Sequence, residues 1–180
     1  GCRSLREPQK IAEFNTLIDE YYPQASFAMP AIQIPTVLPE RTFLEKIFLL
    51  HEEFSKPKQA IRVERLSRHL YDVYQLSKTE IKQNALNDTE LYETIVKHRH
   101  NFTRISKVDY NRHQPQFINP IPPNEVIKAW EADYNTMLSE MIYGDAPTFE
   151  ELIEELTKLK TQINNLDWKM QTEFPLPKSY

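Results

Sequence analysis

Two oppositely charged residues stand beside apolar stripes on neighbouring segments of the chain. Lys46 lies on the flank of a stripe in residues 39–54, and Asp72 lies beside a stripe in residues 62–76. At helical spacing, the side chains of the two stripes are Phe43, Ile47, Leu50 and Phe54, then Val63, Leu66, Leu70 and Val73. A lysine on such a flank must reach water or pair with an anion. Two helices packed through these stripes could bring Lys46 and Asp72 to one rim.

The charged neighbours of Asp72 also have a simpler interpretation. Arg65, Arg68 and His69 line up with it on a helix face next to the apolar stripe. Arg68 and Asp72 are four residues apart, so they can form a surface ion pair that contributes about 0.3–0.5 kcal/mol. Lys46 can likewise be an ordinary flank residue. Because charged helix faces are usually solvated, periodicity alone favours this simpler interpretation.

Two short motifs favour a functional site over a solvated helix face. Residues 39–46 read PERTFLEK and residues 68–72 read RHLYD, with a basic spacer between them. The pair resembles the P-x-R-T-F-x-E-K and R-x-x-Y-D helices in the C-terminal part of AbiEii/AbiGii-type nucleotidyltransferase toxins, from type IV toxin-antitoxin and phage-defence systems. The resemblance implies that Lys46 and Asp72 are catalytic, and that Arg65, Arg68 and His69 contact substrate.

The same resemblance implies a reaction and its partners. An intact enzyme of this kind is expected to transfer a nucleotide from a nucleoside triphosphate, with Mg²⁺, to an acceptor that in related toxins is the 3′ end of tRNA. A cognate antitoxin protein is the expected partner. The alternative is a non-catalytic helical module that binds an antitoxin or another protein, for which the broad face of residues 124–144 is a candidate surface.

The usual metal and phosphate motifs of such enzymes are missing from the chain. It contains no Asp-x-Asp pair, and Gly1 and Gly144 are its only glycines, so no glycine-rich loop can cradle phosphates. His98 and His100 are two residues apart and point to different helix faces, which does not suit zinc. We therefore expect no metal or cofactor site here. We expect the chain to be the C-terminal half of a longer protein, inactive alone.

Composition limits the class of protein. The chain has 180 residues, 40% hydrophobic and 27% charged, which is typical of a folded globular protein. A formal net charge of −4 argues against a general nucleic-acid-coating surface. One cysteine permits no internal disulfide, and no apolar run is long enough for a membrane span, so we expect a cytoplasmic protein with no membrane contact.

The patterns predict a mainly α fold, a helical bundle domain with at most one or two short edge strands. We expect residues 1–38 to hold a helix, marked by Ile11, Phe14 and Leu17, and an extended Pro-rich segment that joins a nucleotidyltransferase sheet outside this chain. Residues 39–180 form the helical domain. Within it we expect three helices, over residues 89–102, 124–144 and 148–166, and residues 97–100 of the first should face water. A long loop should cover residues 101–123, and the tail after Trp168 should fray.

The loop over residues 101–123 leaves two possibilities open. Basic and aromatic residues alternate in it and could contact RNA, namely Arg104, Lys107, Tyr110, Arg112 and His113. The favoured alternative is a packed surface loop held by Tyr110 and Phe117.

Overall fold

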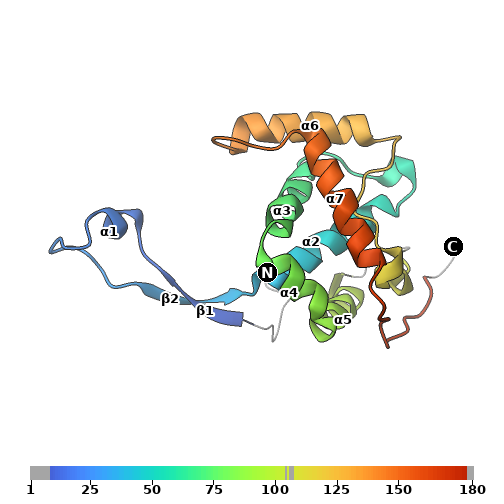
Figure 1. Cartoon of the computed structure of the whole chain (residues 1–180), viewed down its shortest axis with the longest axis horizontal. Helices are drawn as coiled ribbons and strands as arrows, with labels where there is room; N and C mark the ends of the chain where they lie inside the picture. The colour runs from blue at the N-terminus through green and yellow to red at the C-terminus, as the bar shows by residue number, and fades with distance from the viewer. Residues whose placement is uncertain (1–8, 104, 106–107, 178–180) are drawn as a thin grey trace. The chain divides into compact units, whose positions relative to one another are not determined.

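The chain divides into two compact units, Gly1–Pro39 and Glu40–Tyr180, in the computed structural model (Figure 1). The structure describes residues 9–103, 105 and 108–177. Helices dominate these residues, and the sheet within them is a single antiparallel pair of strands, so the mainly α fold class is confirmed. None of the described helices is both long and apolar enough to cross a bilayer.

The first unit is built on a β-hairpin. Strand β1 (Gln9–Phe14) pairs antiparallel with β2 (Ile32–Val37), and α1 (Leu17–Tyr21) lies in the connection between them. The hydroxyl of Thr16 caps α1 by accepting from the Asp19 amide. The extended Pro-rich segment expected within residues 1–38 is present and contains β2. The helix expected from residue 11 onward is wrong before Leu17, because backbone pairing with β2 outweighs the weak helical spacing of Ile11 and Phe14.

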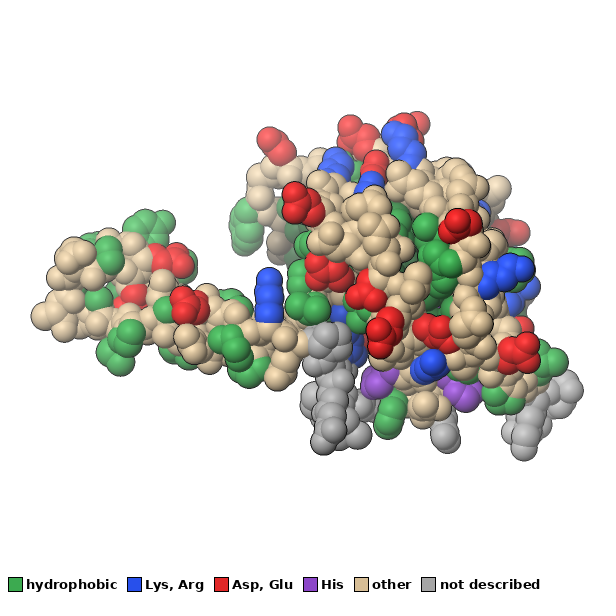
Figure 2. All heavy atoms as spheres, turned by 60° about the horizontal axis from the view of Figure 1, so that its bottom comes forward, with side chains coloured by type: hydrophobic (Ala, Val, Ile, Leu, Met, Phe, Trp, Pro, Cys, Tyr) green, Lys and Arg blue, Asp and Glu red, His purple; other side chains and the backbone are tan. Residues whose placement is uncertain are grey.

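Apolar side chains of the first unit remain exposed (Figure 2). Large examples between 44% and 78% exposed are Ile11, Phe14, Leu17, Ile18, Tyr21, Tyr22, Phe27, Met29, Ile32, Ile34 and Val37. A two-stranded hairpin without further packing is at best marginally stable in water. That it joins a larger nucleotidyltransferase sheet stays a prediction.

The second unit is organised around α2 (Pro39–Phe54) and α3 (Ser67–Ser77), which are joined through the short 3₁₀ turn η1 (Lys58–Ala60). The apolar stripe of α2 is fully buried at Phe43, Ile47 and Leu50. Helix α3 packs against α4 (Glu80–Asn87), α6 (Ile127–Met141) and α7 (Phe149–Asn164). Helix α5 (Thr89–His98) completes the bundle beside α4.

Helices α6 and α7 lie within the predicted segments 124–144 and 148–166 but are shorter, since α6 ends at Met141 rather than at Gly144 and α7 ends at Asn164. In α6, Trp130, Tyr134 and Met137 are buried, so the apolar face considered above as a docking surface for an antitoxin is occupied by the core. Gly144 has φ +92°, a conformation that suits glycine, and ends the segment after α6. Thr148 and Glu151 form a capping box at the start of α7, with the hydroxyl accepting from the Glu151 amide and the carboxylate accepting from the Thr148 amide.

The segment between α5 and α6 is more ordered and more buried than a surface loop. It contains the π-helical turn η2 (Arg99–Thr103) and two 3₁₀ turns, η3 (Tyr110–His113) and η4 (Pro115–Phe117). Tyr110 is buried as expected, whereas Phe117 is 55% exposed. Of the residues considered for RNA contact, His113 is completely buried, and Arg104 and Lys107 lie outside the described residues. A continuous RNA surface of those five residues is therefore excluded.

Two further expectations are wrong. Arg99 was expected to face water, but it is buried and pairs with Glu52 of α2. The tail after Trp168 was expected to fray, but Met170 and Phe174 are buried. Backbone groups of the tail bind side chains far away in sequence, since the Met170 amide donates to Gln114 Oε1 and the Phe174 amide donates to Asn111 Oδ1. Contacts of this range leave no periodic signal in the tail itself.

Three consecutive buried polar residues fix the end of α2. His51 Nδ1 accepts from the Asn119 amide at 3.1 Å, which ties α2 to the segment after η4. Glu52 accepts from Arg99 Nε at 2.7 Å and pairs with His113 Nε2 at 3.0 Å. Glu53 accepts from the Arg62 amide at 2.8 Å, which ties α2 to the connection leading into α3. Together they join α2 to the connection before α3 and to three places in the segment between α5 and α6, at Arg99, His113 and Asn119.

Candidate functional site

Lys46 of α2 and Asp72 of α3 are in direct contact. Lys46 Nζ lies 2.6 Å from Asp72 Oδ2 and 3.3 Å from His69 Nδ1, so the ammonium donates to both side chains. The side chains of Lys46 and Asp72 are 22% and 38% exposed, which leaves the pair reachable from solvent. The rim expected from the two apolar stripes is thus present. It combines the ammonium of Lys46 from α2 with the imidazole of His69 and the carboxylate of Asp72, which lie one turn apart on α3.

His69 is a neutral member of this cluster. Burial, and next the nearby charges of Lys46 and Arg68, lower the pKa of His69 to about 4. Its 3.9 Å contact with Asp72 is therefore not an ion pair near neutral pH. Since Nδ1 accepts from Lys46, the ring proton sits on Nε2. The histidine orients the lysine without adding charge to the cluster.

The two arginines considered as substrate contacts lie at the start of α3, Arg65 in the turn before it and Arg68 in its first turn. Arg65 and Arg68 are exposed and line a small hollow beside Asp133 and Glu140 of α6. Arg65 has φ +59°, an unusual conformation for a residue other than glycine. Neither arginine has an ion pair within the described part of the chain. The structure therefore brings Lys46, His69 and Asp72 together, places Arg68 near His69, and sets Arg65 towards α6.

Asp133 fixes the start of α3 and was not recognised from the sequence. Its Oδ1 accepts from the Arg65 amide at 2.7 Å, and its Oδ2 accepts from the Ser67 amide at 3.0 Å and the Ser67 hydroxyl at 2.5 Å. A carboxylate from another helix thus does the work of an N-cap residue. No spacing along the chain relates position 133 to position 67, so a sequence pattern could not have revealed it.

We expect Asp133→Ala to destabilise the protein by about 1–3 kcal/mol, because two backbone amides lose a charged acceptor and Arg65 loses the contact that holds its unusual φ. Denaturant unfolding followed by circular dichroism measures the loss. Glu131→Ala, at an exposed position on the same helix, is the matched control and should change little. Equal unfolding midpoints for the two variants would contradict the assignment.

Two histidines with lowered pKa values predict that the protein loses stability in mild acid. Burial, and next the neighbouring His113, lower the pKa of His51 to about 3, and the pKa of His69 is lowered to about 4. Below pH 6.5 these histidines become protonated in the unfolded chain but stay neutral in the folded protein. Stability is thus complete above pH 6.5 and falls as the pH drops towards 4, by about 1.4 kcal/mol per pH unit for the buried His51.

The measurement is denaturant unfolding at pH 7.0, 6.0 and 5.5, a range chosen above the titration of the carboxyl groups. His51→Asn keeps a side-chain acceptor for the Asn119 amide but cannot take up a proton. Its stability should fall less steeply over this range than that of the unchanged protein. A His51→Asn variant with the same pH dependence as the parent would show that His51 is not responsible.

The described residues do not provide a metal site. They contain no group of three or more His, Cys, Asp or Glu side chains arranged to hold an ion. At the Lys46 cluster, Asp72 is the single carboxylate, and one of its oxygens already accepts from the ammonium. Mg²⁺ prefers several hard oxygen ligands in an octahedral arrangement. This cluster alone therefore does not fit Mg²⁺.

Comparison with known families decides the relationship. The model of the family described as nucleotidyl transferase AbiEii toxin, type IV TA system, matches residues 1–155. The chain belongs to the AbiEii family. No curated protein and no solved structure matches it. The resemblance stated from residues 39–46 and 68–72 is confirmed, and both AbiEii segments lie inside the matched range. Membership of a type IV toxin-antitoxin family implies an antitoxin partner.

Proposed function

We propose that this AbiEii-family chain supplies one wall of a nucleotide-transfer site, formed by Lys46 and Asp72. The observation that supports this most strongly is the contact between them, made by the two family-like motifs across two helices and left partly open to solvent. A pair that only stabilised the fold would not need His69 as a second, neutral acceptor for the same ammonium. The substrate is a nucleoside triphosphate and the acceptor is a hydroxyl group, with the 3′ end of tRNA as the candidate.

Lys46 acts on the phosphates in this proposal. An ammonium has three donors, and two are directed at Asp72 and His69. The third is available for a phosphoryl oxygen, where negative charge grows as the acceptor oxygen attacks the α-phosphorus and pyrophosphate leaves. Because Asp72 and His69 already orient the ammonium, little reorganisation accompanies the reaction.

Asp72 acts on the acceptor. Its Oδ2 accepts from Lys46, and its other oxygen is free to orient the attacking hydroxyl and accept its proton. Arg65, in the turn before α3, and Arg68, in its first turn, are exposed cations that suit phosphates of an RNA acceptor, with Arg68 nearer to the cluster. His69 serves as a positioning residue for Lys46 rather than as a substrate contact, which revises the role expected from the sequence.

Lys46 and Asp72 do not supply the ligands for Mg²⁺. The family's chemistry is expected to use Mg²⁺, and the Lys46 cluster does not fit the ion, so we propose that other residues hold it. We accordingly propose that the chain alone binds a triphosphate weakly and transfers nothing.

The test incubates the chain with Mg²⁺, labelled nucleoside triphosphates and tRNA, and separately measures by calorimetry the binding of UTP, a triphosphate whose base has no exocyclic amino group. We expect no label transfer, and UTP binding that Lys46→Ala weakens by about tenfold. Lys128→Ala, at an exposed position of α6, is the control and should bind UTP as the parent does. Label transfer by the chain alone would overturn the proposal about the metal. UTP binding indifferent to Lys46→Ala would overturn the role of the lysine.

A further inference from the structure

A second concave site lies at the far end of α2. It is a pocket of about 630 Å³ beside the C-terminal turn of this helix. Ser55, in its wall, follows Lys46 by nine residues, which corresponds to about 14 Å along a helix and half a turn around it. The pocket is therefore separate from the Lys46 cluster. Its lining residues are His51, Phe54, Ser55, Lys56, Pro57, Ala60, Val108, Asp109, Arg112, Phe117 and Asn119.

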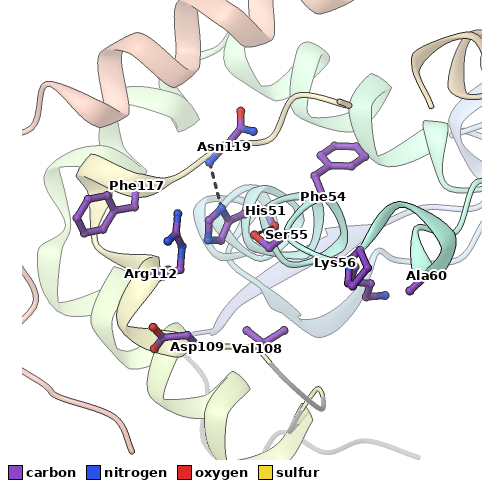
Figure 3. A pocket seen from close by; sticks show the side chains of 11 residues that line it. His51, Phe54, Ser55, Lys56, Ala60, Val108, Asp109, Arg112, Phe117 and Asn119 are labelled. Atoms are coloured by element: carbon purple, nitrogen blue, oxygen red, sulfur yellow. Dashed lines mark hydrogen bonds between the residues drawn. The ribbon is translucent and has the colours of Figure 1, made fainter. Parts of the chain in front are cut away.

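The walls combine aromatic rings with cations. Figure 3 shows Phe117 and Arg112 on one side of His51, and Phe54 and Lys56 on the other. The Arg112 guanidinium carbon lies 5.9 Å from the centre of the exposed Phe117 ring, and Arg112 has no acidic partner among the described residues. Lys56 Nζ donates to Glu53 at 2.7 Å, which leaves two of its donors for another group. Rings beside the unpaired Arg112 and the two remaining donors of Lys56 suit a ligand that is both aromatic and anionic.

One lining residue, Asn119, has an acceptor that lacks a donor. Asn119 Oδ1 is buried and has no hydrogen-bond partner among the described residues, although the Asn119 backbone amide donates to His51 Nδ1 at 3.1 Å (Figure 3). Because this oxygen is buried, a ligand donor reaches it only when the Asn119 side chain turns towards the pocket, and the new hydrogen bond then recovers the free energy that an unpaired buried acceptor costs. Asp109 is the acidic residue of the wall, and its Oδ1 accepts from the Asn111 amide. His51 is neutral, so the lining side chains carry two positive charges, at Lys56 and Arg112, and one negative charge, at Asp109. Lys56 is also paired with Glu53, which leaves Arg112 as the main anion-binding group of the wall.

We propose that this pocket binds a nucleotide whose base carries an exocyclic amino group. The base packs against Phe54 or Phe117, its amino group donates to Asn119 Oδ1, and its phosphate binds Arg112 with support from Lys56. The volume lies within the usual range for small-molecule sites. This site is independent of the proposed transfer reaction, because neither Lys46 nor Asp72 contributes to it. The nucleotide is either free in solution or part of a single RNA strand.

The test measures binding to the full chain by calorimetry, with AMP, IMP, ribose 5-phosphate and a four-adenosine RNA as probes. Trp130 provides a second signal, since its ring centre lies 4.7 Å from that of the pocket residue Phe54. We expect AMP to bind at least about fivefold more tightly than IMP, which lacks the amino group, or ribose 5-phosphate, which lacks the base. The RNA binding more tightly than AMP would identify a strand as the source, and AMP binding at least as tightly would identify a free nucleotide.

The variants separate this site from the Lys46 cluster. Arg112→Ala should weaken AMP binding by about tenfold and Phe117→Ala by about fivefold, and both residues are exposed, so the fold should survive their replacement. Lys46→Ala should leave AMP binding at the pocket unchanged. No binding of AMP or the RNA at millimolar concentration, equal affinity for AMP and IMP, or loss of binding in Lys46→Ala but not in Arg112→Ala would each overturn the proposal.

Discussion

Glu52→Ala is expected to destabilise the protein by about 3–5 kcal/mol, because it leaves a charged guanidinium buried without its partner. Glu52 and Arg99 are 1% and 10% exposed at their side chains, and Arg99 donates to both carboxylate oxygens. Burial alone would raise the pKa of Glu52, but the hydrogen bonds from Arg99 and His113 outweigh it and lower the pKa. The carboxylate therefore remains ionised in the core, and its loss also frees His113 Nε2.

The measurement is denaturant unfolding at pH 7, with Glu154→Ala as the control. Glu154 also forms an ion pair, with Lys158 one turn along α7, but both side chains are more than 60% exposed, so its removal should leave the unfolding midpoint unchanged. The double variant Glu52→Leu with Arg99→Met should lose less stability than the two single variants added together, because neither charge is left unpaired. A loss below about 1 kcal/mol for Glu52→Ala would show that Arg99 finds another partner.

The predictable parts of this fold are those that sequence periodicity encodes. Phe43, Ile47 and Leu50 on α2 and Leu70 and Val73 on α3 are buried as expected, whereas Phe54, Val63 and Leu66 of the same predicted stripes are only partly buried, and Val63 and Leu66 precede α3. The stripes allowed Lys46 and Asp72 to meet at one rim, and the family resemblance was needed to favour a site there. The capping box of α7 was predictable for the same reason, since its two side chains act within one turn.

Contacts between distant segments account for what the sequence could not show. β1 exists through its pairing with β2, about twenty residues later in the chain, and the tail is held by Gln114 and Asn111. Glu52 did leave a signal that was overlooked. It follows Phe48 by four residues, and Phe48 follows Leu44 by four, so a charged residue stands on the apolar side of α2. A carboxylate there requires a buried cation, although the sequence does not say that the cation is Arg99.

Lys46→Met and Asp72→Asn are expected to abolish function while preserving the fold. Each is expected to lower nucleotide transfer by about 10²–10³-fold, the usual effect of removing one group that stabilises transition-state charge or positions the nucleophile. Asp72 is 38% exposed, so an unpaired partner at this rim can be solvated, and the change in stability should stay below about 1 kcal/mol. Large functional loss with little structural loss distinguishes a reactive pair from a structural one such as Glu52 with Arg99.

Transfer is measured with Mg²⁺ and the further residues that we propose to hold it, and triphosphate binding is measured with the chain alone. His69→Gln is the informative companion variant, because its amide oxygen can still accept from Lys46 while the imidazole is lost. It should retain most of the transfer that Lys46→Met removes, since His69 is proposed to orient the lysine rather than to contact substrate. If Lys46→Met and Asp72→Asn both kept full transfer, the contact between α2 and α3 would be an ordinary ion pair. If His69→Gln were as inactive as Lys46→Met, the imidazole itself would take part in the reaction.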